Sequence, residues 1–425
     1  MDNLNRKIAP ESNSISSMNL IQGSKYLTKN NIPFHYIHVP ESLVLKVDFV
    51  FHGGLRNQLF NGQASATGSL LTEGTSIYSA KELADNLDAF GAYLQSKTNV
   101  DDSQLTLYCL PKFLPRVMGY ILSVLTDCSF PEKEIDTYKT NAIQRFSVNL
   151  QRNSFLNRRA FYSSIFGNGN AYGSAVNQED YANISRETVS SFYSNNILPG
   201  IKYVLISGEA SGPVLTELES ALSHFSSSPV DAKAIILPAN SPHELFIENE
   251  YSVQSAIRIG RQLFGRKHSD FKKMQVLNMA LGGFFGSRLM RNIREEKGLT
   301  YGIYSAMESY WDGGAFYIET EMNNELRNTG VIEILKEISL LRENPLANDE
   351  LILVKNYLLG SFLRSIDGPF SLADRYKMIL DYGFTYDYYN EFVETIRSIS
   401  ASEIQELANT YLQEKDLTTV IVGRK

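Results

Sequence analysis

Two stretches of this 425-residue chain decide its fold: residues 184–208, ISRETVSSFYSNNILPGIKYVLISG, and residues 399–423, ISASEIQELANTYLQEKDLTTVIVG. Each opens on Ile-Ser, continues as a helix capped by that serine, and ends as an apolar strand closed by glycine. The spacing from the opening isoleucine to the closing glycine is the same in both. Matching modules near the ends of two halves predict a duplicated domain, although helix–turn–strand segments are common enough to match by chance.

The segments before the first module predict a mixed domain of helices and strands. Residues 34–52 predict two strands, and residues 105–109 predict another. Helices are expected over residues 62–71, over residues 80–94 after a capping serine, and through residues 131–165. The fold class predicted is therefore α+β, with a mixed sheet and helices packed on it in each of two homologous domains.

The duplication divides the chain into four segments. We expect a polar, irregular N-terminal arm over residues 1–30, a first domain over residues 31–222 and a second domain over residues 244–425. Residues 223–243, SHFSSSPVDAKAIILPANSPH, have the Ser and Pro content typical of a linker between domains.

Composition and charge exclude several classes of protein. A net charge of −7 argues against a dedicated nucleic-acid binder, which would carry a basic face. The first residues lack the apolar core of a signal peptide, and no apolar run is long enough to span a bilayer, so we expect a cytoplasmic protein without membrane contact. The two cysteines, Cys109 and Cys128, cannot make a disulfide framework; their pairing is not determined by sequence, but buried thiols are expected.

The densest pattern lies at residues 282–302, GGFFGSRLMRNIREEKGLTYG. The SRLMRNIREE segment has helical spacing, Lys-Gly ends the helix, and a strand follows. Arg294 is thus expected near a helix end and Tyr301 at a strand start, where a loop can bring them together. A guanidinium and a phenol aimed at one point could hold a peptide carbonyl and stabilise the oxyanion formed on attack. An isolated Arg and Tyr would more often be a helix-end charge and a strand aromatic.

Three glycines, Gly282, Gly283 and Gly286, open this block. They would let a substrate backbone pass close to the chain, or they would allow tight packing of the chain on itself; both interpretations are open. The run lacks the spacing and the Lys-Ser/Thr of a phosphate-binding loop, so nucleotide binding is not supported.

The block GGFFGSRLMRNIREEKGLTYGIYS resembles the C-terminal signature of the pitrilysin, or insulinase, peptidases. The resemblance covers nearly the whole chain, including VDFVFHGGLRNQ at residues 47–58, the helix SAKELADNLDAFGA, and both terminal modules. In that family an Arg and a Tyr seven positions apart contact the scissile peptide opposite a zinc ion, and Arg294 and Tyr301 fall on those positions. The resemblance implies a pitrilysin-like fold that forms half of a clam-shell.

The zinc motif of the family is altered in this chain. Active members carry H-x-x-E-H, in which two histidines bind zinc and the glutamate is the general base. The corresponding stretch, residues 62–75, has Ser65 and Ser69 at the histidine positions and Gly68 at the base position. Hydroxyls are poor zinc ligands. The helix expected to supply a third ligand, residues 137–153, contains no carboxylate, and the scattered histidines offer no substitute, so no metal or cofactor is expected in this chain.

The resemblance then implies a zinc-free subunit, inactive alone, that clamps the substrate of a heterodimeric metalloendopeptidase. Its partner would be a chain of similar size with an intact H-x-x-E-H and a bound zinc ion. The peptide substrate would add as a strand to an exposed sheet edge. Two alternatives remain: a structural or assembly homologue, as in the core subunits of respiratory complexes, and a peptide-binding homodimer without proteolysis. The sequence does not determine substrate length, side-chain preference or the oligomeric state in isolation.

Overall fold

The computed structural model describes residues 20–223, 225 and 234–425. Two mixed sheets carry the fold, so the predicted α+β class with two sheets is confirmed. Throughout, the first half is the chain up to residue 223 and the second half is the chain from residue 234.

Among the described residues, the first sheet has six strands in the order β1-β2-β6-β3-β5-β4. β1, β2 and β3 follow one another along the chain, β4 and β5 come after α1 and α2, and β6 belongs to the first terminal module. The strands are β1 (Ser24–Leu27), β2 (Pro33–His38), β3 (Leu45–Phe51), β4 (Tyr93–Thr98), β5 (Ser103–Cys109) and β6 (Ile201–Gly208). The helices are α1 (Gln63–Leu70), α2 (Ala80–Asp88), α3 (Leu114–Thr126), α4 (Glu132–Asn149), α5 (Asn153–Phe166), α6 (Arg186–Phe192) and α7 (Gly212–Leu222).

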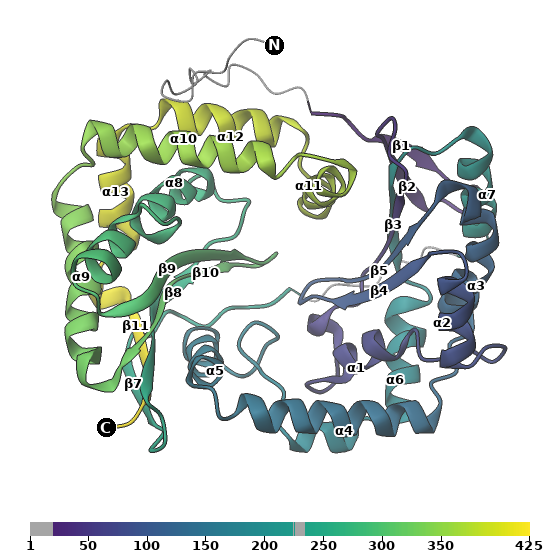
Figure 1. Cartoon of the computed structure of the whole chain (residues 1–425), viewed down its shortest axis with the longest axis horizontal. Helices are drawn as coiled ribbons and strands as arrows, with labels where there is room; N and C mark the ends of the chain where they lie inside the picture. Colours follow the sequence, from purple (N-terminus) through teal and green to yellow (C-terminus); the bar gives the residue numbers. More distant parts are fainter. Residues whose placement is uncertain (1–19, 224, 226–233) are drawn as a thin grey trace, which may run out of the picture.

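The second sheet has five described strands in the order β7-β11-β8-β10-β9. The strands are β7 (Glu244–Glu248), β8 (Gln254–Leu263), β9 (Thr300–Ser309), β10 (Gly314–Asn323) and β11 (Thr418–Gly423). The helices are α8 (Phe271–Gly282), α9 (Arg327–Glu343), α10 (Asn348–Arg364), α11 (Pro369–Tyr382), α12 (Asp387–Ser398) and α13 (Ala401–Tyr411). Figure 1 shows the two sheets on opposite sides of the molecule, each with helices on its outer face.

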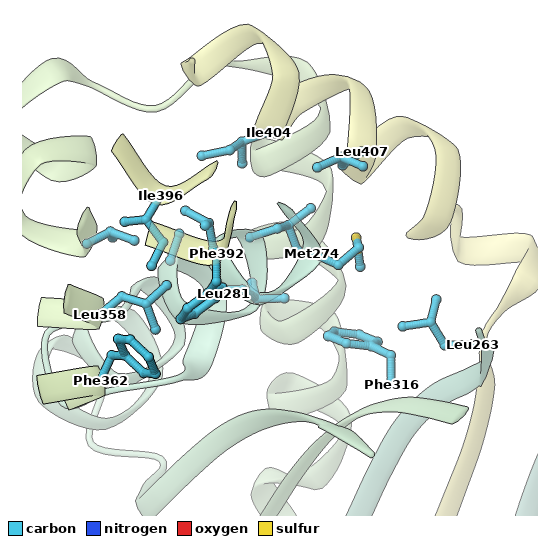
Figure 2. Packing of buried hydrophobic residues seen from close by; sticks show 14 of the residues in the cluster. Leu263, Met274, Leu281, Phe316, Leu358, Phe362, Phe392, Ile396, Ile404 and Leu407 are labelled. Atoms are coloured by element: carbon cyan, nitrogen blue, oxygen red, sulfur yellow. The ribbon is translucent and has the colours of Figure 1, made fainter. Parts of the chain in front are cut away.

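The core of the second half forms where the helices cover the sheet. Figure 2 shows side chains from β8 and β10 packed with side chains from four of the helices. This burial of apolar surface is the main stabilising contribution of the half. The labelled members are Leu263, Met274, Leu281, Phe316, Leu358, Phe362, Phe392, Ile396, Ile404 and Leu407.

The two terminal modules occupy the same place in the two sheets. β6 is parallel to β2 and antiparallel to β3, and β11 is parallel to β7 and antiparallel to β8. Ser185 caps α6 and Ser400 caps α13, each accepting a hydrogen bond from the backbone N–H three residues on. The predicted capped helix and closing strand are therefore present in both modules.

Each half also lends one helix to the other half's sheet. α5 packs against β8 and β11, and α11 packs against β6 and β2. Figure 1 shows both helices on the inner faces of the sheets, toward the middle of the molecule. Asn157 on α5 donates to the carbonyls of Ala256 and Val420, while Lys202 on β6 pairs with Asp381 on α11 at 2.8 Å. The two sheets thus do not form separate packing units, and the division at residues 223–243 stays a prediction.

Two expectations about local structure are wrong. Residues 24–27, inside the arm expected to be irregular, form β1 and pair with β2; residues 1–19 of that arm lie outside the described residues. The helix expected to reach residue 94 ends at Asp88, because Gly91 takes a φ of 61° and Tyr93 already begins β4. In the linker, residues 234–243 form neither helix nor strand, and the rest, apart from residues 223 and 225, lies outside the described residues.

Both cysteines are free thiols in the first half. Burial raises the pKa of Cys109 and of Cys128 to about 12, so both remain protonated at neutral pH. Across the described residues, no helix is long and apolar enough to cross a membrane.

Candidate substrate groove and altered metal motif

A short helix connects α8 to the edge strand β9. It is the π-type helix η5 (Met290–Glu296), held to the core by the fully buried Leu289 and Ile293. Gly298 ends it in the left-handed region, with a φ of 61°, and the Leu299 N–H donates to the Ile293 carbonyl at 3.0 Å. This turn leads the chain straight into β9, as the Lys-Gly pair predicts.

Arg294 and Tyr301 meet beside this turn. The guanidinium carbon of Arg294 lies 5.6 Å from the centre of the Tyr301 ring and 4.7 Å from the centre of the Phe285 ring. Both distances are within the range of cation–π attraction. The Tyr301 side chain is 90% exposed, which is unusual for a residue inside a strand, so the pair can be reached from solvent.

Two cations close to Arg294 in the sequence are paired with carboxylates, whereas Arg294 is not. Arg288 makes a bidentate salt bridge with Glu350, with hydrogen bonds of 2.7 and 2.9 Å, and Lys297 pairs with Glu333. Within the part of the chain that the structure describes, Arg294 makes no side-chain hydrogen bond or ion pair. Its five N–H donors are therefore available to a ligand.

The pair lines a groove of about 460 Å³ next to β9. Four of the five residues predicted for the site lie in its wall, and Gly286 does not. β9 ends the sheet, with β10 as its neighbour on one side, so its other edge is open in the described structure. The groove is lined by Gly282, Gly283, Phe284, Phe285, Met290, Arg294, Tyr301, Gly302, Ile303 and Tyr304.

The three glycines have packing roles of their own. A Cβ on Gly282 would lie 2.5 Å from the backbone nitrogen of Ser305, and a Cβ on Gly283 would lie 2.7 Å from the Cα of Met279. A Cβ on Gly286 would meet a nearby phenylalanine ring at 2.8 Å. These contacts favour tight packing of the chain on itself over approach of a substrate, and the substrate-binding role of the glycines stays a prediction.

The altered metal motif lies on α1, which packs next to β4, an edge strand of the first sheet. A Cβ on Gly68 would lie 2.3 Å from the Thr98 hydroxyl oxygen, so a glutamate at the base position would overlap Thr98 as it is placed in this chain. Ser69 is exposed on α1. Ser65 and Ser69 offer hydroxyls alone, and no group of three His, Cys, Asp or Glu residues among the described residues could hold a metal. These residues do not fit a zinc ion.

A similar contact between a helix and an edge strand occurs in both halves: α1 packs on β4, and α8 packs on β9. We call each of these helix–strand contacts a joint. The Thr98 hydroxyl of β4 donates at 3.4 Å to the α1 carbonyl four residues before Gly68. The Ser305 hydroxyl of β9 donates at 3.1 Å to the α8 carbonyl four residues before Gly282. Gly68 and Gly282 are thus equivalent positions of the duplicated fold.

Sequence reasoning missed Phe285 and Tyr304 as residues of the groove. Phe285 lies under the Arg294 guanidinium, and the Tyr304 side chain is 46% exposed on β9. Strict alternation would place Tyr304 on the face opposite Tyr301, but the register of β9 against β10 shifts between Thr320 and Met322. The position of Phe285 depends on how the 283–287 turn folds back.

Comparison with known proteins agrees with this geometry. Residues 183–358 match the family model described as the peptidase M16 inactive domain. The chain is 24% identical over 365 residues to the uncharacterized zinc protease YmxG of Bacillus subtilis, which covers 83% of this chain and 86% of that protein. It is 23% identical over 417 residues to the non-peptidase homolog YmxG of Helicobacter pylori, with 94% and 91% covered.

A solved structure shares the fold over nearly its full length. The crystal structure of a peptidase M16 inactive domain from Pseudomonas fluorescens has a TM-score of 0.85 and 19% identity, and the match covers 95% of this chain and 98% of that one. The two mixed sheets and the altered α1 motif define a non-catalytic relative of the zinc peptidases. Residues 183–358 match the inactive domain of the M16, or pitrilysin-like, peptidases, and the resemblance identified from the sequence is confirmed.

Proposed function

We propose that this chain is the zinc-free subunit of a two-chain peptidase and that it holds the peptide that its partner cuts. The observation that carries the proposal is the unpaired Arg294 beside the exposed Tyr301, both in a groove at an open sheet edge. The matching helix of the other half, α1, does not fit a metal. The chain therefore has donors for a substrate carbonyl without the groups that activate water.

The open edge of β9 suits an extended peptide. Unpaired backbone N–H and C=O groups of an edge strand can bind a peptide as an added strand, which gives affinity without side-chain specificity. In this arrangement the planar guanidinium of Arg294 holds a substrate carbonyl. The Tyr301 hydroxyl donates to the oxyanion that develops when the partner's water attacks.

A second chain must supply the metal and the base. We propose a partner of similar size with an intact H-x-x-E-H and a bound zinc ion. The description of the matching family model as an inactive domain supports a chain that works with an active subunit, as does the name non-peptidase homolog given to the Helicobacter pylori relative.

The test is peptide cleavage by this chain alone, by an H-x-x-E-H chain of the same organism alone, and by the mixture, with zinc quantified in each. We expect cleavage by the mixture only, and zinc in the partner only. Arg294→Ala or Tyr301→Phe should each lower kcat of the mixture by about 10²–10³, the usual effect of losing an oxyanion donor.

Two matched variants control for charge and for aromatic exposure. Arg291→Ala removes an exposed arginine from the same short helix, and Tyr251→Phe alters a tyrosine that is 92% exposed. Both should leave kcat within about twofold, as surface substitutions away from a site do. Stoichiometric zinc and cleavage by this chain alone would show that the α1 motif has been misread. If no mixture cuts, a structural role or a peptide-binding homodimer takes the place of this proposal.

A further inference from the structure

A second cavity, of about 500 Å³, lies between α4, α5 and the segment 171–176. Three arginines, Arg145, Arg158 and Arg159, line it together with aromatic rings, and its lining contains no carboxylate. We call this cavity the arginine pocket. A concentration of positive charge in a hollow is notable in a chain with a net charge of −7, because acidic residues outnumber basic ones in the chain as a whole.

Arg159 forms a fixed part of the wall. Its guanidinium donates to the Val176 carbonyl at 2.5 Å and to the Asn177 side chain at 2.6 Å. It also lies over the rings of Phe146 and Phe155, at 5.4 and 5.5 Å. These contacts order the guanidinium before any ligand arrives, which lowers the entropic cost of binding.

Arg145 and Arg158 keep free donors. Arg145 uses its Nε to donate to the Asn141 carbonyl at 3.3 Å, and the Arg158 guanidinium lies 5.7 Å from the centre of the Tyr162 ring. Neither makes an ion pair with a carboxylate anywhere in residues 20–223, 225 or 234–425. Two unpaired guanidiniums beside an ordered third one are typical of a site for a carboxylate.

Carboxylates next to the pocket do not cancel its charge. Asp101 and Asp312 accept hydrogen bonds from Tyr172 of the lining, and both pair with Arg56. Asp180 acts on Arg159 from outside the lining, where it accepts a hydrogen bond from the Asn177 backbone at 2.7 Å. Glu308 accepts hydrogen bonds from the hydroxyls of Tyr310 and Tyr317. These two carboxylates keep their negative charge, but the lining itself contains three arginines and no carboxylate, so the pocket is still cationic.

A line of tyrosine rings connects this pocket to the groove at β9. Tyr304 lines the groove and lies 6.5 Å from Tyr317, which lies 6.5 Å from Tyr162 in the pocket wall. The outer two rings are thus at most about 13 Å apart, which about four residues of extended peptide would span. A peptide held at the groove could reach the pocket with one of its carboxylates.

We propose that the arginine pocket binds a carboxylate of the peptide held along β9, about four residues from Tyr304. The carboxylate is either the C-terminus of a short peptide or an acidic side chain of a longer one; the guanidinium chemistry is the same for both. This proposal rests on the proposed function and adds a substrate class, peptides with a carboxylate at a set distance from the groove.

The test is direct binding to the purified chain, without a partner. Fluorescence anisotropy is measured with three labelled peptides of one apolar core sequence: one with a free C-terminus, one with a C-terminal amide, and one amide with a single glutamate four residues from its end. We expect a carboxylate-bearing peptide to bind at least about tenfold more tightly than the plain amide, the usual effect of hydrogen bonds to a charged group.

The double variant Arg145→Gln/Arg158→Gln should abolish that preference and leave the amide peptide unchanged. The control Arg116→Gln/Arg152→Gln removes the same charge from exposed positions of the same half and should keep the preference. Preference for the free C-terminus alone identifies a terminal carboxylate, and preference for the glutamate peptide identifies a side chain. Equal binding of all three peptides, or no binding, overturns the proposal.

These outcomes separate the two proposals. Cleavage by the mixture that depends on Arg294, together with carboxylate-independent binding here, overturns the pocket and leaves the clamp intact. Carboxylate-dependent binding together with cleavage that does not depend on Arg294 supports the arginine pocket and overturns the clamp role of Arg294.

Discussion

The joint between α1 and β4 and the joint between α8 and β9 share the same backbone packing but carry different functional side chains. Each places a helix glycine against the edge strand of its sheet, with a strand hydroxyl bonded to the helix carbonyl four residues earlier. The first joint carries Ser65 and Ser69 and no group that could bind a metal. The second leads into Arg294 and Tyr301. The packing of helix against edge strand is thus the same in both halves, while the side chains beside it differ.

The two joints also differ in how tightly they are packed. The atom nearest a Cβ on Gly68 is a side-chain hydroxyl, whereas the atom nearest a Cβ on Gly282 is the backbone nitrogen of Ser305. A side chain can rotate away, but the backbone of a paired strand cannot move without breaking its ladder. The second joint should tolerate change less well.

The largest expected effect tests which joint acts on the substrate. In the mixture with a zinc-bearing partner, Arg294→Ala should lower kcat by about 10²–10³, because a charged donor to the substrate is lost. The double variant Ser65→Ala/Ser69→Ala should keep kcat within about twofold, since these hydroxyls have no part in the reaction. Steady-state kinetics on both variants checks this. A larger loss from the serine variant than from Arg294→Ala would reverse the assignment of roles to the two halves.

The next effect concerns the tighter joint. Gly282→Ala should lower the free energy of unfolding by about 3 kcal/mol, because the new methyl group overlaps the backbone of β9. Gly360→Ala, in α10 with open space around it, should instead raise the free energy of unfolding by up to about 1 kcal/mol. Urea unfolding followed by circular dichroism measures both. Equal effects of the two variants would contradict the close approach of α8 to β9.

A smaller effect is expected at the first joint. Gly68→Ala should cost about 1–2 kcal/mol, and Thr98→Ala in the same chain should relieve most of that cost by removing the overlapping hydroxyl. Gly119→Ala, in open space on α3, is the matched control and should be neutral or stabilising. A double-mutant cycle in urea provides the coupling energy. Additive costs would mean that Thr98 does not close the base position.

The smallest effect concerns the contact between the first sheet and α11. His35 on β2 is buried and lies 2.9 Å from the Tyr376 hydroxyl on α11. Burial, and secondarily the charge of Lys25, lowers the pKa of His35 to about 4. Between pH 6.5 and 4 the unfolded histidine takes up a proton that the folded one does not, so the free energy of unfolding falls as pH falls through this window.

His35→Gln should remove part of that pH dependence while keeping a hydrogen-bonding group toward Tyr376. Unfolding in urea at pH 7 and pH 5 measures the difference for the wild type and the variant. If the wild type and His35→Gln lost the same free energy of unfolding between pH 7 and pH 5, His35 would titrate normally and its burial would be incomplete.

Much of the fold and of the candidate site follows from local sequence. The repeated modules predict two capped helices that each lead to a central strand, because capping and alternation act within a few residues. Arg294 and Tyr301 are seven positions apart around a Lys-Gly stop, so a single turn brings them together. The substitutions Ser65, Gly68 and Ser69 remove zinc chemistry whatever the fold, because neither a hydroxyl nor a hydrogen atom replaces an imidazole or a carboxylate.

Long-range packing decided the rest. The helix expected to reach residue 94 stops at Asp88 because β4 must pair with β5, and residues 24–27 become a strand because β2 offers an open edge. The exchange of α5 and α11 between the sheets, and the arginine pocket that joins α4 and α5 to Tyr310, unite residues far apart in the chain. Sequence by itself determined the chemistry that this protein lacks and the pair that it keeps. Tertiary structure alone decided what surrounds them, because side chains from distant segments meet only when the sheets pack.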